Sequence, residues 1–475
     1  MRALVGSIAA AGLLLQLGCS SSDPEPTETS DCTTGTTVGD VCVGVPSEPL
    51  CSDTFCTENV SCTNVVQVVD QAALEAAAGS ASAGDCLALQ PGNYGRVVIS
   101  GGVHLLGKGA DHVALDYVEV SGGTGTVIRG VTVGADGIKL DAAASVTITS
   151  VRVSAETLDG VDANAGSSVS VVDSEIHGAA RYAISAFDVT QVDVERSVLN
   201  GAQGPGMWAQ CTGGCDCQTT VSVNISDSVI RDTKIVGLSF VGVDAVLRNV
   251  EISGNTVDNH FNPGGGMSVS QCSSVDAVGL SVLDNSNFGV LIDDSTVSFG
   301  EQGSTTIEVM RNLRGIWVQN IGASSQQSVT LQGIDVGENT GVGVGIDGES
   351  TNVTVRDGTV RDTTLIDLPV LVGGVSASSE EIGDGVNWFA LSQVTLESLT
   401  VSNSARSSVL IDGDVGAGST IRSVTLASGD DSKGILQQNF VNGGVQPSVQ
   451  AAPSVTTSAE EEFAIAQPPA IPPGI

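Results

Sequence analysis

Two pairs of closely spaced aspartates are the residues of this sequence best suited to acid–base chemistry. Asp159 and Asp162 flank a Gly-Val dipeptide, and Asp293 and Asp294 are adjacent. Hydrolysis of a glycosidic bond needs two carboxyl groups, one as general acid and the other as base or nucleophile. Either pair supplies them only where the fold turns both side chains toward one face.

Two histidines are the candidates for a catalytic base. His177 precedes Arg181 and Tyr182, and His260 ends the run Asp258-Asn259-His260. A lyase needs such a group to take a proton from a sugar carbon. The alternative is structural, because the chain has four histidines and none has a matched catalytic partner in the sequence. No nucleophile elbow, phosphate loop or zinc spacing is present.

A five-residue cell recurs along the chain and carries the candidate binding residues. Its pattern is small, apolar, variable, apolar, polar, and copies begin at Gly137, Gly160, Gly206, Gly266, Gly289, Gly315, Ser408 and Gly434. If the apolar positions point inward along a strand, the variable position between them points outward. That outward column contains Lys139, Asp162, Ser185, Trp208, Ser239, Ser268, Leu291 and Trp317.

Trp208 and Trp317 are the candidate carbohydrate contacts, with Arg314 beside the second. An exposed indole on a flat sheet suits stacking against a sugar face. The alternative is that an insertion loop covers each tryptophan. For Trp208 the loop starting at Cys211 follows directly, which favours that alternative.

The last position of the cell is polar in every copy. Its residues are Asp141, Asn164, Gln210, Ser270, Asp293, Gln319, Asp347, Asp412 and Gln438. Side chains stacked at strand ends are expected to form a hydrogen-bonded ladder. The alternative is a Ca²⁺ site built from neighbouring carboxylates. No short motif of Ca²⁺-ligand spacing supports it, so we expect no metal and no other cofactor.

The spacing between cells indicates a solenoid. Most intervals are 23 to 29 residues, and each cell is preceded by two further strand signals, such as Val146–Ile148 and then Val151 and Val153. Three short strands per coil, where a coil is one turn of the solenoid, predict three parallel sheets around an apolar interior. The chain should therefore be all-β, a single-stranded parallel β-helix over residues 63–449.

The composition of the chain limits the classes of partner that it can bind. The formal net charge is −36, with 59 glycines and few aromatic residues. Nucleic acid is excluded, because its binding needs lysine and arginine to displace counterions. The acidic surface keeps a long rod soluble, and we expect a monomer.

The opening of the solenoid resembles a known superfamily. Residues from Val65 to Ala78 have the pattern of a short helix, and Gly84–Tyr94 follows as G-D-x-apolar-x-L-x-P-G-x-Y. This order resembles right-handed parallel β-helices of the pectin-lyase-like superfamily, in which an N-terminal helix caps the coil. The resemblance implies the fold and is nearly silent about activity. The His-Gly and Arg-x-Lys motifs of polygalacturonase-type relatives do not occur here.

The N-terminus has the pattern of an export signal. Residues 1–19 have a short basic start and an apolar core, and Leu17-Gly18-Cys19 resembles a bacterial lipobox. We expect Cys19 to be lipidated and to hold the protein on the outer membrane of a Gram-negative bacterium. Gln16 departs from the lipobox pattern, so ordinary signal-peptidase cleavage is the alternative. Residues 20–31 then read as a disordered tether, and residues 450–475 as a Pro-rich tail.

The remaining ten cysteines form two even groups. One group opens in a cysteine-rich segment, residues 32–62, and the members are Cys32, Cys42, Cys51, Cys56, Cys62 and Cys86. Disulfides would compensate for the missing core of this segment in an exported protein. Cys86 should tie the segment to the first coil.

The second cysteine group is Cys211, Cys215, Cys217 and Cys272. Aligned coils place Cys211 and Cys272 in the same corner of the solenoid, two coils apart, which is too far for a direct bond. Cys272 should therefore bond Cys215 or Cys217, and the remaining one should bond Cys211.

The function expected from these features is a lipid-anchored envelope protein with a non-catalytic binding or structural role. Carbohydrate is the expected ligand class. The alternative is a polysaccharide lyase or glycoside hydrolase acting on the face of the helix, since one fold hosts both classes.

Overall fold

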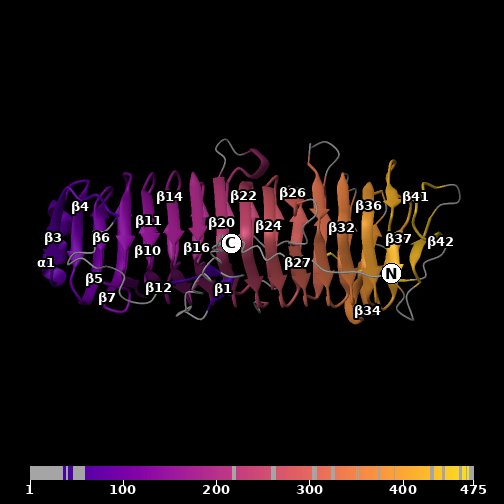
Figure 1. The fold of residues 1–475 in the computed structure, drawn as a ribbon, viewed down its shortest axis with the longest axis horizontal. Coiled ribbons are helices and arrows are strands. Elements are labelled where there is room, and N and C mark those ends of the chain that lie inside the picture. Colours follow the sequence, from indigo (N-terminus) through magenta and orange to yellow (C-terminus); the bar gives the residue numbers. More distant parts are fainter. Residues whose placement is uncertain are drawn as a thin grey trace, which may run out of the picture.

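The protein is a long rod of stacked coils, seen in the computed structural model (Figure 1). Strands succeed one another along the long axis, from the end that holds α1 (Gln71–Ser80) to the end that holds β42 (Val455–Thr457). The structure describes residues 36–38, 41–45, 59–216, 221–257, 264–301, 307–321, 327–348, 350, 352–372, 375–389, 391–427, 433–440, 444–458, 463–466 and 468–469.

Three parallel sheets run the length of the rod. Sheet 1 carries the five-residue cells, on β10 (Ile138–Leu140), β13 (Val161–Ala163), β16 (Ile184–Phe187), β19 (Met207–Gln210), β21 (Val236–Val241), β23 (Gly265–Ser270), β25 (Phe288–Asp293), β28 (Arg314–Gln319), β31 (Val342–Asp347), β35 (Asp384–Phe389), β37 (Ser407–Asp412), β40 (Ile435–Gln438) and β42.

Sheet 2 holds the strand that follows the sheet 1 strand of each coil. Its strands are β3 (Asn64–Val68), β4 (Asp85–Leu89), β6 (His104–Leu106), β8 (Thr126–Arg129), β11 (Ser145–Thr149), β14 (Ser168–Val172), β17 (Gln191–Glu195), β26 (Thr296–Phe299), β29 (Val329–Gln332), β38 (Thr420–Arg422) and β41 (Ser448–Gln450). Sheet 3 holds β9 (Thr132–Val133), β12 (Arg152–Ser154), β15 (Glu175–His177), β18 (Val198–Asn200), β27 (Ile307–Met310), β30 (Ile334–Gly337) and β39 (Thr425–Ala427).

Some strands bend around a corner and serve two sheets. β5 (Gly92–Ser100) and β7 (Val113–Ser121) join sheets 3 and 1. The strands that join sheets 2 and 3 are β20 (Val221–Arg231), β22 (Val243–Ser253), β24 (Ser274–Leu283), β32 (Val353–Arg361) and β36 (Val394–Ser402). The predicted prism of three parallel sheets is therefore confirmed, whereas three short strands per coil is wrong for these coils, in which one long strand replaces two short ones.

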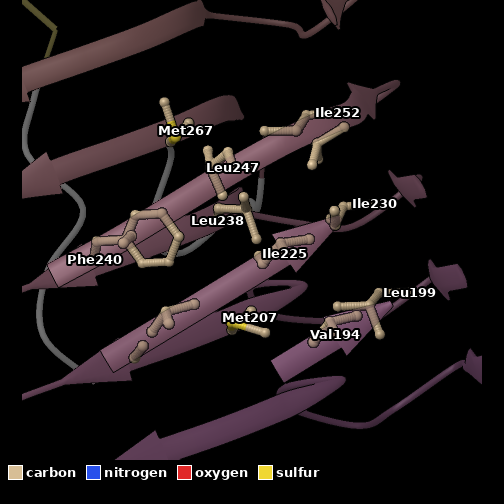
Figure 2. Close-up of a cluster of buried hydrophobic side chains, with 14 of the residues drawn as sticks. Val194, Leu199, Met207, Ile225, Ile230, Leu238, Phe240, Leu247, Ile252 and Met267 are labelled. Carbon is tan, nitrogen blue, oxygen red and sulfur yellow. The ribbon is translucent and has the colours of Figure 1, made fainter. Parts of the chain in front are cut away.

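The interior is a continuous column of aliphatic side chains. In-register pairing places Met207 beside Leu238 and Leu238 beside Met267 on successive coils, and Figure 2 shows these three residues one above another. Val171 and Ile292 are fully buried, as the alternation of the strands predicts. Burial of such side chains contributes about 25 cal/mol per Å² of apolar surface.

The N-terminal cap differs in its bounds from the predicted helix. Asn64–Val68 forms β3, which pairs with β4, and the helix α1 begins only after Asp70. The β-branched valines before Asp70 favour a strand, and the Asp70 carboxylate accepts a hydrogen bond from the Ala73 amide as an N-cap. Leu74 on α1 is fully buried against the first coils. The predicted capping helix is thus confirmed, and its expected start at Val65 is wrong.

Part of the cysteine-rich segment lies on the side of the rod. The strands β1 (Thr37–Val38) and β2 (Val41–Cys42) form a hairpin, and Val38 and Val43 pack against Val198 and Val229 of sheet 3. The Cys62–Cys86 disulfide, with its Cα atoms 5.6 Å apart, ties the segment to β4. Cys42 is also disulfide-bonded, while Cys32, Cys51 and Cys56 lie outside the described residues.

Two other features project from the coils. β33 (Ile366–Val372) and β34 (Val375–Ile382) form an antiparallel hairpin. The 3-10 helix η1 (Gly214–Asp216) lies in the loop after β19, and Cys215 there bonds Cys272, as the coil alignment predicts. Cys211 is disulfide-bonded as well, whereas Cys217 lies outside the described residues.

A strap from the C-terminal region lies on the outer face of sheet 1. We use the name for residues 463–466, in which Ala464 and Ala466 are buried against Trp317. The Pro-rich region therefore contributes packing to the rod. None of the helices in the described part of the chain is long and apolar enough to cross a membrane.

Candidate functional site

The outer column of sheet 1 brings several candidate residues together. Lys139 on β10 pairs with Asp162 on β13, which pairs with Ser185 on β16. All three occupy the outward position between two buried residues of their strands. The predicted register of this face is confirmed.

Asp159 is the centre of the site. It lies at the corner before β13 and is 2% exposed. Arg181, one coil later, donates to both of its oxygens, with Nε 3.0 Å from Oδ1 and Nη2 2.8 Å from Oδ2. The Tyr182 amide and the Ser185 hydroxyl also donate to Asp159, at 3.3 and 2.9 Å. Such a bidentate pair fixes both planar groups.

Glycine at the neighbouring corner allows this close packing. Gly137 has φ of +69°, and a Cβ atom there would clash with the carbonyl oxygen of Asp159. A left-handed conformation without a side chain is what glycine provides at little cost. The corner therefore places Asp159 directly beside β10.

Asp162 lies next to Asp159 through a shared hydroxyl. The Ser185 Oγ atom is 2.9 Å from Asp159 Oδ2 and 3.2 Å from Asp162 Oδ1. Burial, and then the charge of Asp159, raise the pKa of Asp162, while Ser185, Arg181 and Lys139 oppose that shift. The prediction that Asp159 and Asp162 lie together on one face is therefore confirmed.

Asp159 and Asp162 line a small open pocket of about 50 Å³. The other residues around it are Tyr117, Asp136, Ile138, Lys139, Leu158 and Arg181. We call these eight residues the Asp159 pocket. It combines carboxylates, two cations, a phenol ring and aliphatic surface.

A chain of contacts continues the pocket toward the helix-capped end. The Lys139 Nζ atom lies 2.9 Å from Asp141 and 3.5 Å from Glu119. The Tyr117 hydroxyl donates to Glu119 at 3.0 Å, and burial raises the pKa of Tyr117 to about 12. The Arg96 guanidinium lies 4.4 Å from the centre of the Tyr117 ring, which is a cation–π distance.

His177 does not join this pocket. It lies on β15 in sheet 3, on another side of the prism, and its Nε2 atom is 3.0 Å from Glu175. Glu175 also receives Arg152 at 3.3 Å. The structural alternative therefore fits His177, although its neighbour in sequence, Arg181, reaches the pocket. His260 lies outside the described residues.

Asp293 and Asp294 point to different partners. Asp293 ends β25 and accepts hydrogen bonds from the Gln319 and Asn320 side-chain amides, at 3.1 and 2.6 Å. Asp294 lies beside the sulfur atoms of Cys215 and Cys272. Since these sulfurs form a disulfide, they are not thiolate ligands for a metal ion. The pair does not supply two converging carboxylates.

Both tryptophans are buried, so the interpretation of them as exposed carbohydrate contacts is wrong and the alternative of covered side chains is correct, although a C-terminal segment rather than an insertion loop covers Trp317. Trp208 is 1% exposed, packs with Tyr182 and Val241, and donates from Nε1 to Gln210 at 2.9 Å. Trp317 is fully buried beneath Ala464 and Ala466 of the strap. When another part of the chain packs over large apolar side chains on the outside of a sheet, their surface is removed from water and the free energy of the folded state falls.

Arg314, predicted as an exposed basic contact, is also buried. Its exposure is 6%, and the Nη1 atom donates to Asn287 at 2.7 Å. Burial lowers the pKa of Arg314 to about 10. The side chain therefore stays cationic at neutral pH without lying on the surface.

Side-chain ladders are present at two places, one of them not predicted. At the end of the cell, Gln319 bonds Asp293 and Gln438 bonds Asp412 one coil apart. The longer ladder lies at the corner before the cell. There each amide nitrogen donates to the oxygen on the next coil, along Asn255, Asn285, Asn312 and Asn339. The recurrence of asparagine at 27 to 30 residues was the signal for it.

Comparison with known proteins supports the fold. The family model for the right handed beta helix region matches residues 102–278, and no curated protein matches the chain. Similar solved structures include the periplasmic alginate epimerase AlgG, at 11% identity over 76% of this chain and 84% of that one, with a TM-score of 0.45.

Two further solved structures are similar at the same level. Pectate lyase Pel9A shares 12% identity over 64% of this chain and 80% of its own, with a TM-score of 0.39. The Streptococcus pneumoniae surface protein and adhesin PfbA shares 10% over 80% and 94%, with a TM-score of 0.28. At these values the likenesses say nothing of what this chain binds. The coil geometry and the family match together make the chain a right-handed parallel β-helix.

Proposed function

We propose that this protein is a non-catalytic carbohydrate-binding β-helix, and that the Asp159 pocket is its binding site. The observation that carries this proposal is the fixed pair of Arg181 and Asp159 on an open face. Sugar hydroxyls are recognised by planar polar groups held in place before binding. Arg181 is 59% exposed in its side chain while Asp159 is 2% exposed, so the pair offers outward donors on a rigid base.

The same pair argues against acid–base chemistry by Asp159. Both of its oxygens accept hydrogen bonds from Arg181, and Ser185 takes a further position. A base or nucleophile needs a free lone pair aimed at the substrate. We therefore assign Asp159 to positioning Arg181.

One observation favours glycoside hydrolysis as a second candidate. Asp162 has a raised pKa beside the ion-paired Asp159, and two carboxyl groups in different environments are how such enzymes divide acid and base roles. In that case Asp162 would be the general acid.

We also propose an exported, lipid-anchored protein, with Cys19 as the anchor. The apolar stretch before Leu17-Gly18-Cys19 supports it. An anchored rod would present its coils to extracellular polysaccharide at the outer membrane.

A binding and cleavage screen tests the carbohydrate proposal. The purified protein is incubated with a panel of neutral and acidic polysaccharides, and both retention and release of reducing or unsaturated ends are measured. We expect retention without cleavage, and weakening of at least about tenfold in Arg181→Ala, a loss typical of one charged hydrogen-bonding pair.

Arg311→Ala is the matched control for that variant. Arg311 forms the same bidentate pair with Asp284, at 2.7 and 2.8 Å, on a different part of the rod. Equal binding by Arg181→Ala and wild type would contradict the proposal. Cleavage that Asp162→Asn abolishes would establish the hydrolase instead.

A further inference from the structure

The outer face of sheet 1 beneath the strap is built from aromatic and aliphatic side chains. We call it the strap-covered face, formed by Phe288, Leu291, Trp317, Val342 and Phe389. The rings of Trp317 and Phe389 lie 5.9 Å apart at 46°. Ala464 and Ala466 complete this cluster from the strap.

Phe463 makes several polar and cation–π contacts between the strap and the coils. The Phe463 amide donates to Gln438 Oε1 at 2.9 Å, and Gln438 Nε2 donates to the Phe463 carbonyl at 2.6 Å. The Phe463 ring lies 4.9 Å from the Arg406 guanidinium and 5.4 Å from the Lys433 ammonium. The partners of Phe463 are side chains of coil residues, Gln438 on β40 and Arg406 before β37, so release of Phe463 breaks no backbone pairing between two coil strands.

One polar atom in the cluster with the strap has no hydrogen-bond partner, the Trp317 Nε1 donor. On the same sheet the Asn387 Oδ1 and Gln319 Oε1 acceptors are also buried and unpaired. Most buried polar groups in proteins are paired. The alanines of the strap have no side-chain group that could pair them, so the cover does not match the polarity of what it covers.

Trp317 and Asn387 both occupy the outer column of sheet 1, two coils apart. Trp317 pairs with Gly345, and Gly345 pairs with Asn387 on the next coil. The six-membered ring of Trp317 lies over Gly345, where a Cβ atom would clash with it. The indole and the Asn387 amide are therefore consecutive side chains of this column.

An indole with an unpaired donor, followed by an unpaired acceptor, is complementary to a sugar ring. The apolar face of a hexose stacks on the indole, and hydroxyl groups along the same saccharide chain accept from Nε1 and donate to Oδ1. An extended chain already lies on this face in the form of the strap. The net charge of −36 disfavours a polyanion.

We propose that the strap-covered face is a second carbohydrate-binding face, for an uncharged polysaccharide, and that residues 463–466 close it in the free protein. The polysaccharide and the strap compete for the same surface. This site is independent of the Asp159 pocket, because the two lie on different coils and share no residue.

Removing the strap tests the competition directly. A chain ending at Ser458 is compared with the full chain for binding of cello-, xylo-, laminari- and mannohexaose by calorimetry. We expect at least one hexaose to bind about tenfold tighter or more to the shortened chain, since apparent affinity scales with the open fraction. Trp317→Ala should abolish this gain, and Trp208→Ala, buried in another cluster, should keep it.

A substitution in the full chain gives an independent reading. Phe463→Ala removes the ring between Arg406 and Lys433 and should increase hexaose binding and the quenching of tryptophan fluorescence by acrylamide. The proposal is overturned if the shortened chain shows the thermal transition of the full chain but no gain for any hexaose. If the shortened chain does not fold, absence of a gain in Phe463→Ala overturns it. Binding that Arg181→Ala weakens but Trp317→Ala leaves unchanged belongs to the Asp159 pocket alone.

Discussion

Arg406 donates to both carboxylate oxygens of Asp384, one coil earlier, in an ion pair that solvent barely reaches. Arg406 is 8% exposed and Asp384 is 0% exposed. Burial raises the pKa of Asp384, while the guanidinium opposes this shift. The pair fastens β37 to β35 directly below the Phe463 ring of the strap.

Arg406→Met should strongly destabilise the rod. It leaves Asp384 buried without a counter-charge, which costs about 3–5 kcal/mol. Arg311→Met breaks an exposed pair and should cost about 1 kcal/mol or less. Urea unfolding followed by circular dichroism measures both. The double change Arg406→Met with Asp384→Leu should recover most of the loss, and equal costs for the two single variants would contradict this ranking.

Stability should depend on pH through Asp162. Its pKa is raised in the folded protein, so the folded state binds the proton more tightly than the unfolded state does. The contribution to stability is therefore full below the unfolded pKa, about 3.9, and is lost as pH rises through the folded pKa.

Asp162→Asn should thus raise the thermal midpoint relative to wild type near pH 7. Near pH 3 the two proteins should unfold at similar temperatures, because the wild-type carboxyl is then protonated. Scanning calorimetry at the two pH values measures the difference. A gain of the same size at both would show that burial does not act on the charge of Asp162.

Charge placed inside the coil should be far more costly than charge placed outside. Val171 is fully buried, whereas Thr147, on the adjacent β11, is partly exposed on the outer side. Val171→Asp should therefore lower the unfolding free energy by several kcal/mol, and Thr147→Asp by about 0.5 kcal/mol or less. Similar midpoints of thermal unfolding for Val171→Asp and Thr147→Asp would mean that the carboxylate introduced at position 171 is hydrated.

The Cys215–Cys272 disulfide should stabilise the corner that holds η1. The Cα atoms lie 5.0 Å apart, and the bond closes a loop with a sequence separation of 57 residues. Cys272→Ser should destabilise by about 2–4 kcal/mol. Non-reducing peptide mapping provides the control: wild type should yield one peptide pair joining these cysteines. Recovery of Cys272 as a free thiol would contradict the pairing.

Cys19→Ala should release the protein from membranes. The change removes the thiol that lipidation requires. The lipid on Cys19 is the membrane attachment that we expect from the sequence. Membrane fractionation measures the shift into the soluble fraction. Mass spectrometry of an unmodified mature N-terminus in the wild type would show that the protein is held in some other way.

Local periodicity was enough to predict the coil. Small-apolar-variable-apolar-polar cells predicted both sheet 1 and its outward column, because each coil repeats the same environment. The neighbourhood of Asp159 and Asp162 followed from that register. Their pairing with Arg181 also lay within reach, since Arg181 follows Asp159 by 22 residues, close to one coil.

Contacts that do not repeat could not be predicted in this way. Trp317 is buried by a strap about 150 residues later in the chain, and no period connects the two. The side position of the hairpin formed by β1 and β2 likewise depends on a few valines meeting sheet 3. Coil periodicity is therefore informative about the body of the rod and silent about what lies on it.

The asparagine ladder limits which additional coils the rod can accept. Each amide from Asn255 to Asn312 donates in the same direction, toward the following coil. A duplicated coil inserted within this stretch would extend the ladder as long as it brought its own asparagine. A coil with another residue there would split the line and leave an amide without a partner. The rod can thus be lengthened between Asn255 and Asn339 by whole coils, provided that each added coil carries an asparagine that donates in the same direction.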